Sequence, residues 1–183
     1  PPRRSSDRFG DHRGGRELVR RIEPLGVRWF AETDISVADD PELLAGLRAA
    51  GCYQLLIGLE SLSAQRLRGV EATGWKARRA SRYVEAVRAI QDAGVTVNTC
   101  FIVGLDGDTP EVFDDIRRFV DEARPLEIQV TVLTPFPGTP LYARLQREGR
   151  LDAPPFWHKC TLFDVNYADR KSTRLNSSHR IRS

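Results

Sequence analysis

The sequence predicts an α/β fold in which four parallel strands form a curved sheet with helices outside it, an incomplete TIM-like barrel. Segments typical of strands alternate along the chain with helical stripes of apolar residues. Each link between successive strands is long enough to contain a helix, which parallel pairing requires. Every strand segment also carries polar residues on one face, whereas parallel strands covered on both faces are continuously apolar. We therefore expect one face to pack on helices and the other to line a polar hollow.

The first half of the chain contains two predicted strands, each preceded by a helix. Residues 18–25 place apolar side chains at helical spacing, and residues 27–31 are typical of a strand. Asp40 comes directly before a proline, a combination typical of a helix start, and Gly51 is expected to end that helix. Residues 53–59 form the second predicted strand.

The second half repeats this plan. Residues 83–90 form a helical stripe that closes on an Ala-Gly pair, and residues 95–103 form the third predicted strand. A helix is expected after Thr109–Pro110, followed by a fourth strand at 127–133. The proline-rich segment 134–140 precedes a last short helix.

The polar face of the predicted sheet gathers side chains from all four strands. It carries Arg28, Glu32, Gln54, Glu60, Asn98, Cys100, Gln129 and Thr131. Folds of this class bind ligands at the carboxyl ends of their strands, and Glu60 lies at one of those ends. Two interpretations stay open, a ligand cavity lined by these residues or the satisfied polar core of a smaller sandwich.

The composition favours a cytoplasmic protein. Charged residues make up 29% of the sequence, and no apolar run has the length of a membrane-spanning helix. The three cysteines are far apart and form no CxxC or CxxxCxxC pattern, so they predict neither a metal cluster nor a disulfide scaffold. The net charge of +3 comes from the arginine-rich ends, while residues 17–168 are mildly acidic, which argues against a nucleic-acid partner.

We divide the chain into four parts. Residues 1–16 are expected to be disordered or a truncated start, and residues 17–151 form the α/β domain. Residues 152–168 are an extension after the barrel. Residues 169–183 are interpreted as a disordered tail, because Asp169–His179 resembles the translation of a common sequencing adapter.

Few residues predict chemistry on their own. Glu60 could bind an amine or hydroxyl of a ligand or form a structural ion pair. Glu32 could bind a ligand, but Thr33 and Asp34 could equally cap the turn at this strand end. Asp106–Asp108 is expected to form a tight turn before a helix rather than a metal loop. No HExxH, P-loop, GxGxxG or Ser-His-Asp pattern is present. The residues alone thus predict a ligand-binding partial barrel without a recognisable catalytic group.

Four segments in this order carry a family resemblance: Val27–Asp34, Ala50–Ser61, Phe101–Phe113 and Leu133–Tyr142. Together they resemble the radical SAM superfamily, most closely the subgroup with an N-terminal cobalamin-binding domain. The resemblance covers about residues 17–151. It implies a (β/α)6 partial barrel of which this chain holds the last four strands.

Members of that family hold a 4Fe-4S cluster on a CxxxCxxC loop, and the cluster cleaves S-adenosylmethionine reductively to a radical. That loop is missing from this sequence, so the resemblance implies an enzyme fragment that holds no cofactor by itself. For the full-length parent it implies the 4Fe-4S cluster, S-adenosylmethionine, an electron donor such as flavodoxin or ferredoxin, and an unknown small-molecule substrate. Cobalamin-dependent methylation is one reaction that the resemblance allows.

The resemblance also assigns the wall that binds S-adenosylmethionine. Glu60, with Ser61 behind it, corresponds to the strand end that contacts the methionine or ribose part. The strand segment that starts at Cys100, where the family often has glycine, corresponds to the one that packs against the adenine. Glu32 and Thr134 would lie on the rim of the cavity. The predicted cofactor-binding residues are therefore Glu60, Ser61, Glu32, Cys100, Ile102, Gly104 and Thr134.

Two other functions stay open at this point. A TIM-like lyase or hydrolase could use Glu32 and Glu60 as acid and base. A non-catalytic module could bind a ligand in the same hollow. A CxxxCxxC loop in the full-length protein would favour the radical SAM interpretation.

Overall fold

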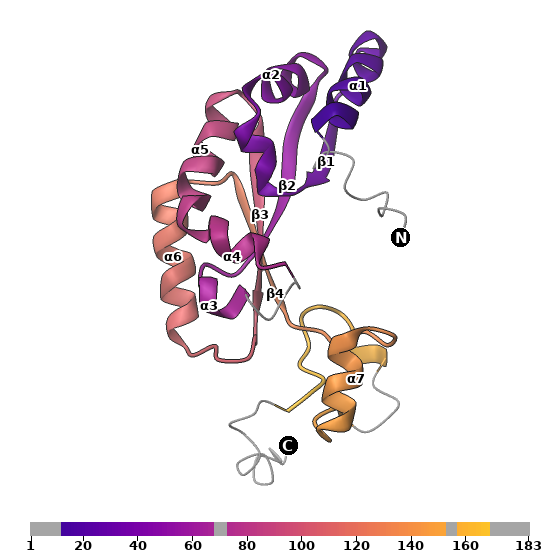
Figure 1. Ribbon diagram of the computed structural model, residues 1–183, viewed down its shortest axis with the longest axis vertical. Helices are drawn as coiled ribbons and strands as arrows, with labels where there is room; N and C mark the ends of the chain where they lie inside the picture. Colours follow the sequence, from indigo (N-terminus) through magenta and orange to yellow (C-terminus); the bar gives the residue numbers. More distant parts are fainter. Residues whose placement is uncertain (1–11, 68–72, 153–156, 169–183) are drawn as a thin grey trace, which may run out of the picture. The chain divides into compact units, whose positions relative to one another are not determined.

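The computed structural model describes residues 12–67, 73–152 and 157–168 (Figure 1). The chain divides into two compact units. The first unit comprises the residues up to Phe101 together with Thr109–Val130, and the second comprises Ile102–Asp108 and the residues from Thr131 onward. The tail expected to be disordered, 169–183, lies outside the described residues.

A four-stranded parallel sheet runs through the chain, as the sequence predicts. Its strands are β1 (Trp29–Thr33), β2 (Cys52–Glu60), β3 (Thr96–Val103) and β4 (Glu127–Val132), in the spatial order β1-β2-β3-β4. Glu32 of β1 pairs with Leu56 of β2, and Leu56 pairs with Asn98 of β3. This register places the side chains of the three residues on one face of the sheet.

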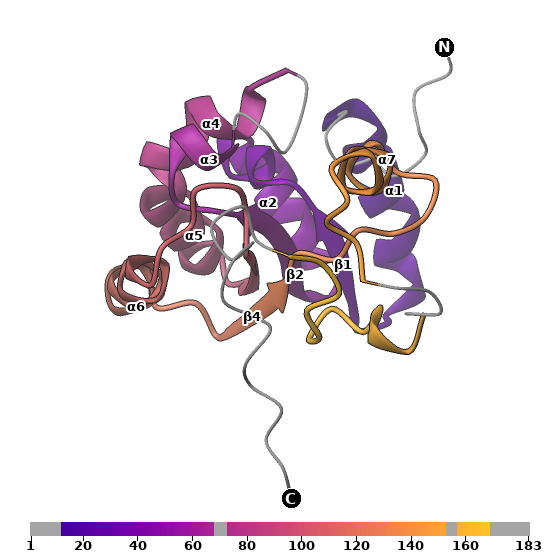
Figure 2. The ribbon, with the colours of Figure 1, turned by 90° about the horizontal axis from the view of Figure 1, so that it is seen from below.

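Helices of the first unit cover the other face (Figures 1 and 2). They are α2 (Pro41–Ala49), α5 (Tyr83–Asp92) and α6 (Glu111–Ala123). Burial alternates along the strands, with Leu55, Ile57 and Leu59 of β2 fully buried beneath the helices. Phe101 of β3 meets Phe119 of α6 edge to face, with ring centroids 5.4 Å apart. The period-two pattern of β2 and β3 thus separates a packed apolar face from a polar one, whereas in β4 Thr131 is buried and Ile128 is exposed.

The N-terminal part of the chain adds one helix and two 3-10 turns. The N-terminal helix α1 (His12–Ile22) is followed by the 3-10 turn η2 (Glu23–Leu25), and η3 (Ile35–Asp39) leads into α2. Helix α1 begins five residues before the expected boundary at 17, because Arg16 forms ion pairs with Asp40 and Glu42 near the start of α2.

The stretch between β2 and α5 holds α3 (Ala64–Leu67), where the sequence favours a short helix capped by Ser63. It also holds α4 (Trp75–Arg79) and the 3-10 turn η4 (Ala80–Arg82), in a part where the sequence shows no clear pattern. The guanidinium of Arg79 lies 4.7 Å from the ring centroid of Trp75, and Arg79 also pairs with Asp39 of η3. The local contact with Trp75 and the ion pair with the distant Asp39 fix a segment that has no apolar periodicity of its own.

The second unit contains the loop after β3, helix α7 (Pro140–Arg147) and the 3-10 turn η5 (Trp157–Lys159). Thr139 caps α7 through its hydroxyl, which accepts a hydrogen bond from the Tyr142 amide. An antiparallel bridge joins Leu151 to Tyr167, and Tyr167 is buried. The predicted extension after the barrel is therefore packed. In the part of the chain that the structure describes, no helix has the length and apolarity needed to cross a membrane.

Candidate functional site

Glu60 ends strand β2 in an unusual backbone conformation. Its φ is +64°, and the pairing with β3 shifts register between Gly58 and Glu60. The side chain folds back over the strand, since a Cβ added to Gly58 would lie only 2.6 Å from Oε1 of Glu60. The bulge and the glycine together hold the carboxylate on the polar face of the sheet.

Lys76 of α4 holds this carboxylate. Its Nζ lies 2.7 Å from Oε1 of Glu60 and donates a second hydrogen bond to the carbonyl oxygen of Gly58 at 2.8 Å. The side chains are 21% and 19% exposed, so the pair is largely shielded from water. Within the described residues the contact of Lys76 with Glu60 uses Oε1, and Oε2 of Glu60 can accept a hydrogen bond from a hydroxyl or ammonium group.

Cys100 and Glu32 lie on the same polar face as Glu60. Cys100 pairs with Gly58 in the register of β2 and β3, and its thiol donates to Oε1 of Gln129 at 3.3 Å. Burial raises the pKa of Cys100, the carboxylates of Glu60 and Glu32 raise it further, and Lys76 opposes them. The structure therefore brings three predicted site residues, from three adjacent strands, into one electrostatic environment.

This environment predicts the pH dependence of Cys100 alkylation. Because the pKa of the thiol is raised, reaction with iodoacetamide should reach half its maximal rate at a higher pH than in a short cysteine peptide. Glu60→Gln should move that midpoint down, and Lys76→Met should move it up. Mass spectrometry of Cys100 across a pH series measures both shifts, and parallel shifts in the two variants would contradict the arrangement.

The other predicted site residues have local contacts. Ser61 is buried, and its hydroxyl accepts a hydrogen bond from the Ser63 amide at 3.2 Å in the turn after β2. In the second unit Thr134 is buried and donates to the carbonyl oxygen of Val132 at 3.0 Å. Gly104, also of the second unit, is exposed with φ +92°, and Ile102 is half-buried.

A hydrogen-bonded cluster occupies the polar face further along the strands. Oε2 of Glu127 accepts from Nε2 of Gln54 and from Nδ2 of Asn98, at 3.1 Å each. The cluster confirms that polar side chains of β2, β3 and β4 share one face, as the alternation predicts. Sequence reasoning missed Lys76 and Gly58, since Lys76 lies in a segment without periodicity and a glycine within a strand has several explanations.

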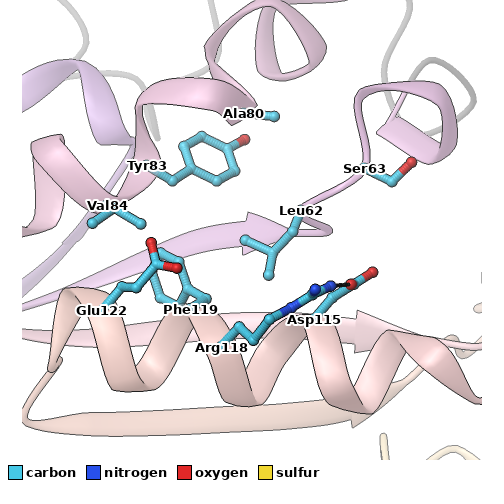
Figure 3. Close-up of a pocket in the computed structure, with 9 residues that line it drawn as sticks. All are labelled: Leu62, Ser63, Ala80, Tyr83, Val84, Asp115, Arg118, Phe119 and Glu122. Carbon is cyan, nitrogen blue, oxygen red and sulfur yellow. Dashed lines mark hydrogen bonds and ion pairs between the residues drawn. The ribbon is translucent and has the colours of Figure 1, made fainter.

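A separate pocket of about 270 Å³ lies on the helical side of the first unit (Figure 3). The ring of Tyr83 on α5 and that of Phe119 on α6 line it, with the carboxylate of Glu122 at one side and the ion pair of Arg118 and Asp115 at another. None of the predicted site residues lines this pocket. The candidate site on the polar face is therefore distinct from it.

The described residues do not fit an iron–sulfur cluster. Within those ranges no three His, Cys, Asp or Glu side chains are placed to hold one metal ion. Cys52 lies on β2 and Cys100 on β3, and no third ligand joins them in the described ranges, whereas a 4Fe-4S cluster is held by several thiolates. For S-adenosylmethionine the chemistry fits better, since Glu60 supplies an anionic acceptor for its hydroxyl or ammonium groups.

Comparison of the sequence with known protein families gives one match. Residues 7–120, more than half of the chain, match the radical SAM superfamily. This chain belongs to the radical SAM superfamily. The family and fold predicted from the four motifs are confirmed.

Two relatives of this chain are bacterial methylating enzymes. The hopanoid C-2 methylase of Rhodopseudomonas palustris (strain TIE-1) is 32% identical over 148 residues, which cover 75% of this chain and 28% of that protein. The bacteriochlorophyllide d C-12(1)-methyltransferase of Chlorobaculum tepidum is 30% identical over 131 residues, 71% of this chain and 28% of that enzyme. The chain thus spans less than a third of the length of these relatives.

A solved structure of a radical SAM methyltransferase shares the fold. TsrM from Kitasatospora setae, with cobalamin and a 4Fe-4S cluster bound, is similar with a TM-score of 0.64. The similarity covers 81% of this chain and 31% of TsrM at 20% identity. At that identity the similarity shows the fold, which agrees with the predicted partial barrel.

Proposed function

We propose that this chain supplies the S-adenosylmethionine-facing strands in the catalytic barrel of a radical SAM enzyme, with Glu60 as the principal ligand-binding residue. The observation that carries the proposal is the carboxylate of Glu60, held at the strand end by Lys76 beside Cys100 and Glu32. The cluster that cleaves S-adenosylmethionine reductively would take its thiolates from a part of the protein outside these residues.

Each site residue of the first unit has a proposed role that follows from its chemistry. Oε2 of Glu60 would accept a hydrogen bond from the ribose hydroxyls or the ammonium of the ligand. Lys76 fixes the orientation of that carboxylate, and Ser61 fixes the turn behind it. Cys100, kept as a neutral thiol, would contribute a small uncharged surface next to it, and Glu32 a charge at the rim.

The second unit holds the other three predicted residues. On the family resemblance alone, we propose that Ile102 and Gly104 contact an adenine and that Thr134 lies on a cavity rim. Gly104 has no side chain and is exposed, and Ile102 offers an apolar side chain, which together suit a flat purine ring.

For the whole protein we propose methylation of a small molecule, with cobalamin as the methyl carrier. The support is the activity of two relatives, a hopanoid methylase and a bacteriochlorophyllide methyltransferase, and the cobalamin bound in TsrM. A flavodoxin or ferredoxin in the cytoplasm would supply the electron for reductive cleavage.

The test is a titration of the 15N-labelled chain with S-adenosylmethionine, followed by NMR. We expect saturable shifts at Glu60 and Cys100. Glu60→Gln should weaken binding at least about tenfold, because a hydrogen bond to a charged acceptor becomes a neutral one and Lys76 loses its partner.

Glu127→Gln is the matched control. Glu127 lies on the same face and also accepts hydrogen bonds from two side chains, but it begins β4 instead of ending a strand. Its replacement should leave the affinity within about twofold. The proposal fails if the wild-type chain shows no saturable shifts, or if both variants lose affinity equally.

A further inference from the structure

Helix α4 carries Lys76, which holds the carboxylate of Glu60, but this helix has little that holds it in place. None of its five described residues is buried, and a helix of this length has little stability of its own. The hydroxyl of Tyr83 on α5 donates to the carbonyl oxygen of Lys76 at 3.3 Å, which is long for a hydrogen bond of this kind. The position of Lys76 therefore depends on the other contacts between α4 and the first unit.

Arg79 supplies a charged contact of this kind. It lies three positions after Lys76, so the two side chains leave the helix from neighbouring parts of its surface. Nη1 of Arg79 donates to Oδ2 of Asp39 in η3, and its guanidinium carbon lies 4.7 Å from the ring centroid of Trp75. The side chains of Arg79 and Asp39 are 29% and 32% exposed, so water screens this pair only in part. Helix α4 is thus tied through Lys76 to the end of β2 and through Arg79 to η3.

Asp39 is the fixed member of its ion pair. It ends η3, in which Ile35 and Val37 are buried. The amide of the next residue, Asp40, donates to the carbonyl oxygen of Val37 at 3.2 Å, and the side chain of Asp40 caps α2. The backbone at Asp39 is therefore set by the core and by α2, and α4 takes its place from Asp39.

We propose that Asp39 is a positioning residue for the carboxylate of Glu60: by holding Arg79 it sets the place of α4, and Lys76 of the same helix then fixes Oε1 of Glu60. The inference rests on the proposed function, in which Glu60 binds the ligand. It adds a residue outside the sheet that acts on Glu60 through two cations and does not itself touch the ligand. Because all of these residues lie in the first unit, their coupling can be measured without a ligand.

Asp39→Asn tests the inference through the alkylation of Cys100. The charged groups that face this thiol are Glu32 of β1, Glu60 of β2 and Lys76 of α4, while Gln129 of β4 is neutral. If Lys76 moves away from the strand end, the thiolate loses a nearby cation. The midpoint of the pH profile should then rise, and the rate at a fixed pH below the midpoint should fall about twofold. Loss of the charge of Asp39 by itself would lower the midpoint, so the direction of the shift separates the two effects.

Further variants and a second measurement complete the test. In a Lys76→Met background, Asp39→Asn should give no additional shift, because its effect passes through Lys76. Asp39→Glu keeps the charge and should leave the profile close to that of the wild type. Glu85→Gln is the matched control and should change nothing, since Glu85 pairs with Arg82 at 3.9 Å and is 76% exposed. Hydrogen exchange at the amide of Arg78 in α4 should become about three- to fivefold faster in Asp39→Asn.

The outcomes separate this inference from the proposed function. A raised midpoint with faster exchange, both absent from Glu85→Gln, supports it. Faster exchange with an unchanged or lowered midpoint makes Asp39 purely structural for α4 and overturns the inference. A shift that persists in the Lys76→Met background, or unchanged exchange in Asp39→Asn, also overturns it. A wild-type chain that does not bind S-adenosylmethionine overturns the proposed function, and the Cys100 profile still decides whether Asp39 positions Glu60.

Discussion

Gly51→Ala is expected to destabilise the first unit by more than about 3 kcal/mol. Gly51 has φ +84°, in the left-handed region where an L side chain alone costs about 1–2 kcal/mol. The added Cβ would also lie 2.2 Å from the carbonyl oxygen of Val27, which is backbone and can move away only by separating β1 from the turn. Urea unfolding followed by far-UV circular dichroism measures the loss.

Gly26→Ala provides the matched control for this change. Gly26 has φ +61°, but no atom lies within 4 Å of its added Cβ. It should therefore lose only the conformational part, about 1 kcal/mol. Similar losses in the two variants would show that the contact with Val27 does not restrict the turn.

The turn at Gly51 matters for the site because it sets the start of β2. The carbonyl oxygen of Gly51 accepts from the amide of Trp29 at 3.2 Å, and the indole of Trp29 donates to the carbonyl oxygen of Ala50 at 2.7 Å. These bonds fix the register of β1 against β2, and a one-residue slip of β1 would turn every side chain of that strand to the opposite face. Glu32 would then no longer share the polar face with Glu60 and Cys100.

The sequence could predict features that depend on local chemistry. Gly51 and Gly94, both after an alanine, were expected to end helices, and both adopt φ +84°. The alternation of polar and apolar residues in β2 and β3 predicted which face each side chain occupies, because a strand has only two faces. The predicted grouping of Glu32, Glu60 and Cys100 followed from that alternation.

Features that depend on contacts between distant residues could not be predicted. The register shift before Glu60 has no signature in the string Ile57–Glu60, and Lys76 reaches Glu60 from a helix whose sequence has no apolar stripe. The hydroxyl of Tyr167 donates to the carbonyl oxygen of Gly104 from 63 positions away, in a segment expected to be a plain extension. Pairing between such positions is set by the packed fold, and a single sequence gives no record of it.

Asp40→Ala is expected to cost about 2–3 kcal/mol, because Asp40 has two functions. Its Oδ1 accepts from the Leu43 amide and caps α2, a role that the sequence predicts. Its Oδ2 accepts from Nη2 of Arg16 at 2.7 Å and from Nε at 3.1 Å, which joins α1 to the start of α2. The Asp40 side chain is 4% exposed, so water cannot replace these bonds.

Two further variants separate the two roles of Asp40. Asp40→Asn keeps a capping oxygen and removes the charge, so it should recover about half of the loss. Glu42→Ala removes the other carboxylate that pairs with Arg16, but that carboxylate is 79% exposed, and its loss should stay within about 0.5 kcal/mol. Because the two acids share one arginine, a large effect at Asp40 and a small one at Glu42 would assign the difference to burial. Equal effects would instead mean that α1 is held to α2 by apolar contacts, such as that between Val19 and Gly46, and not by the ion pair.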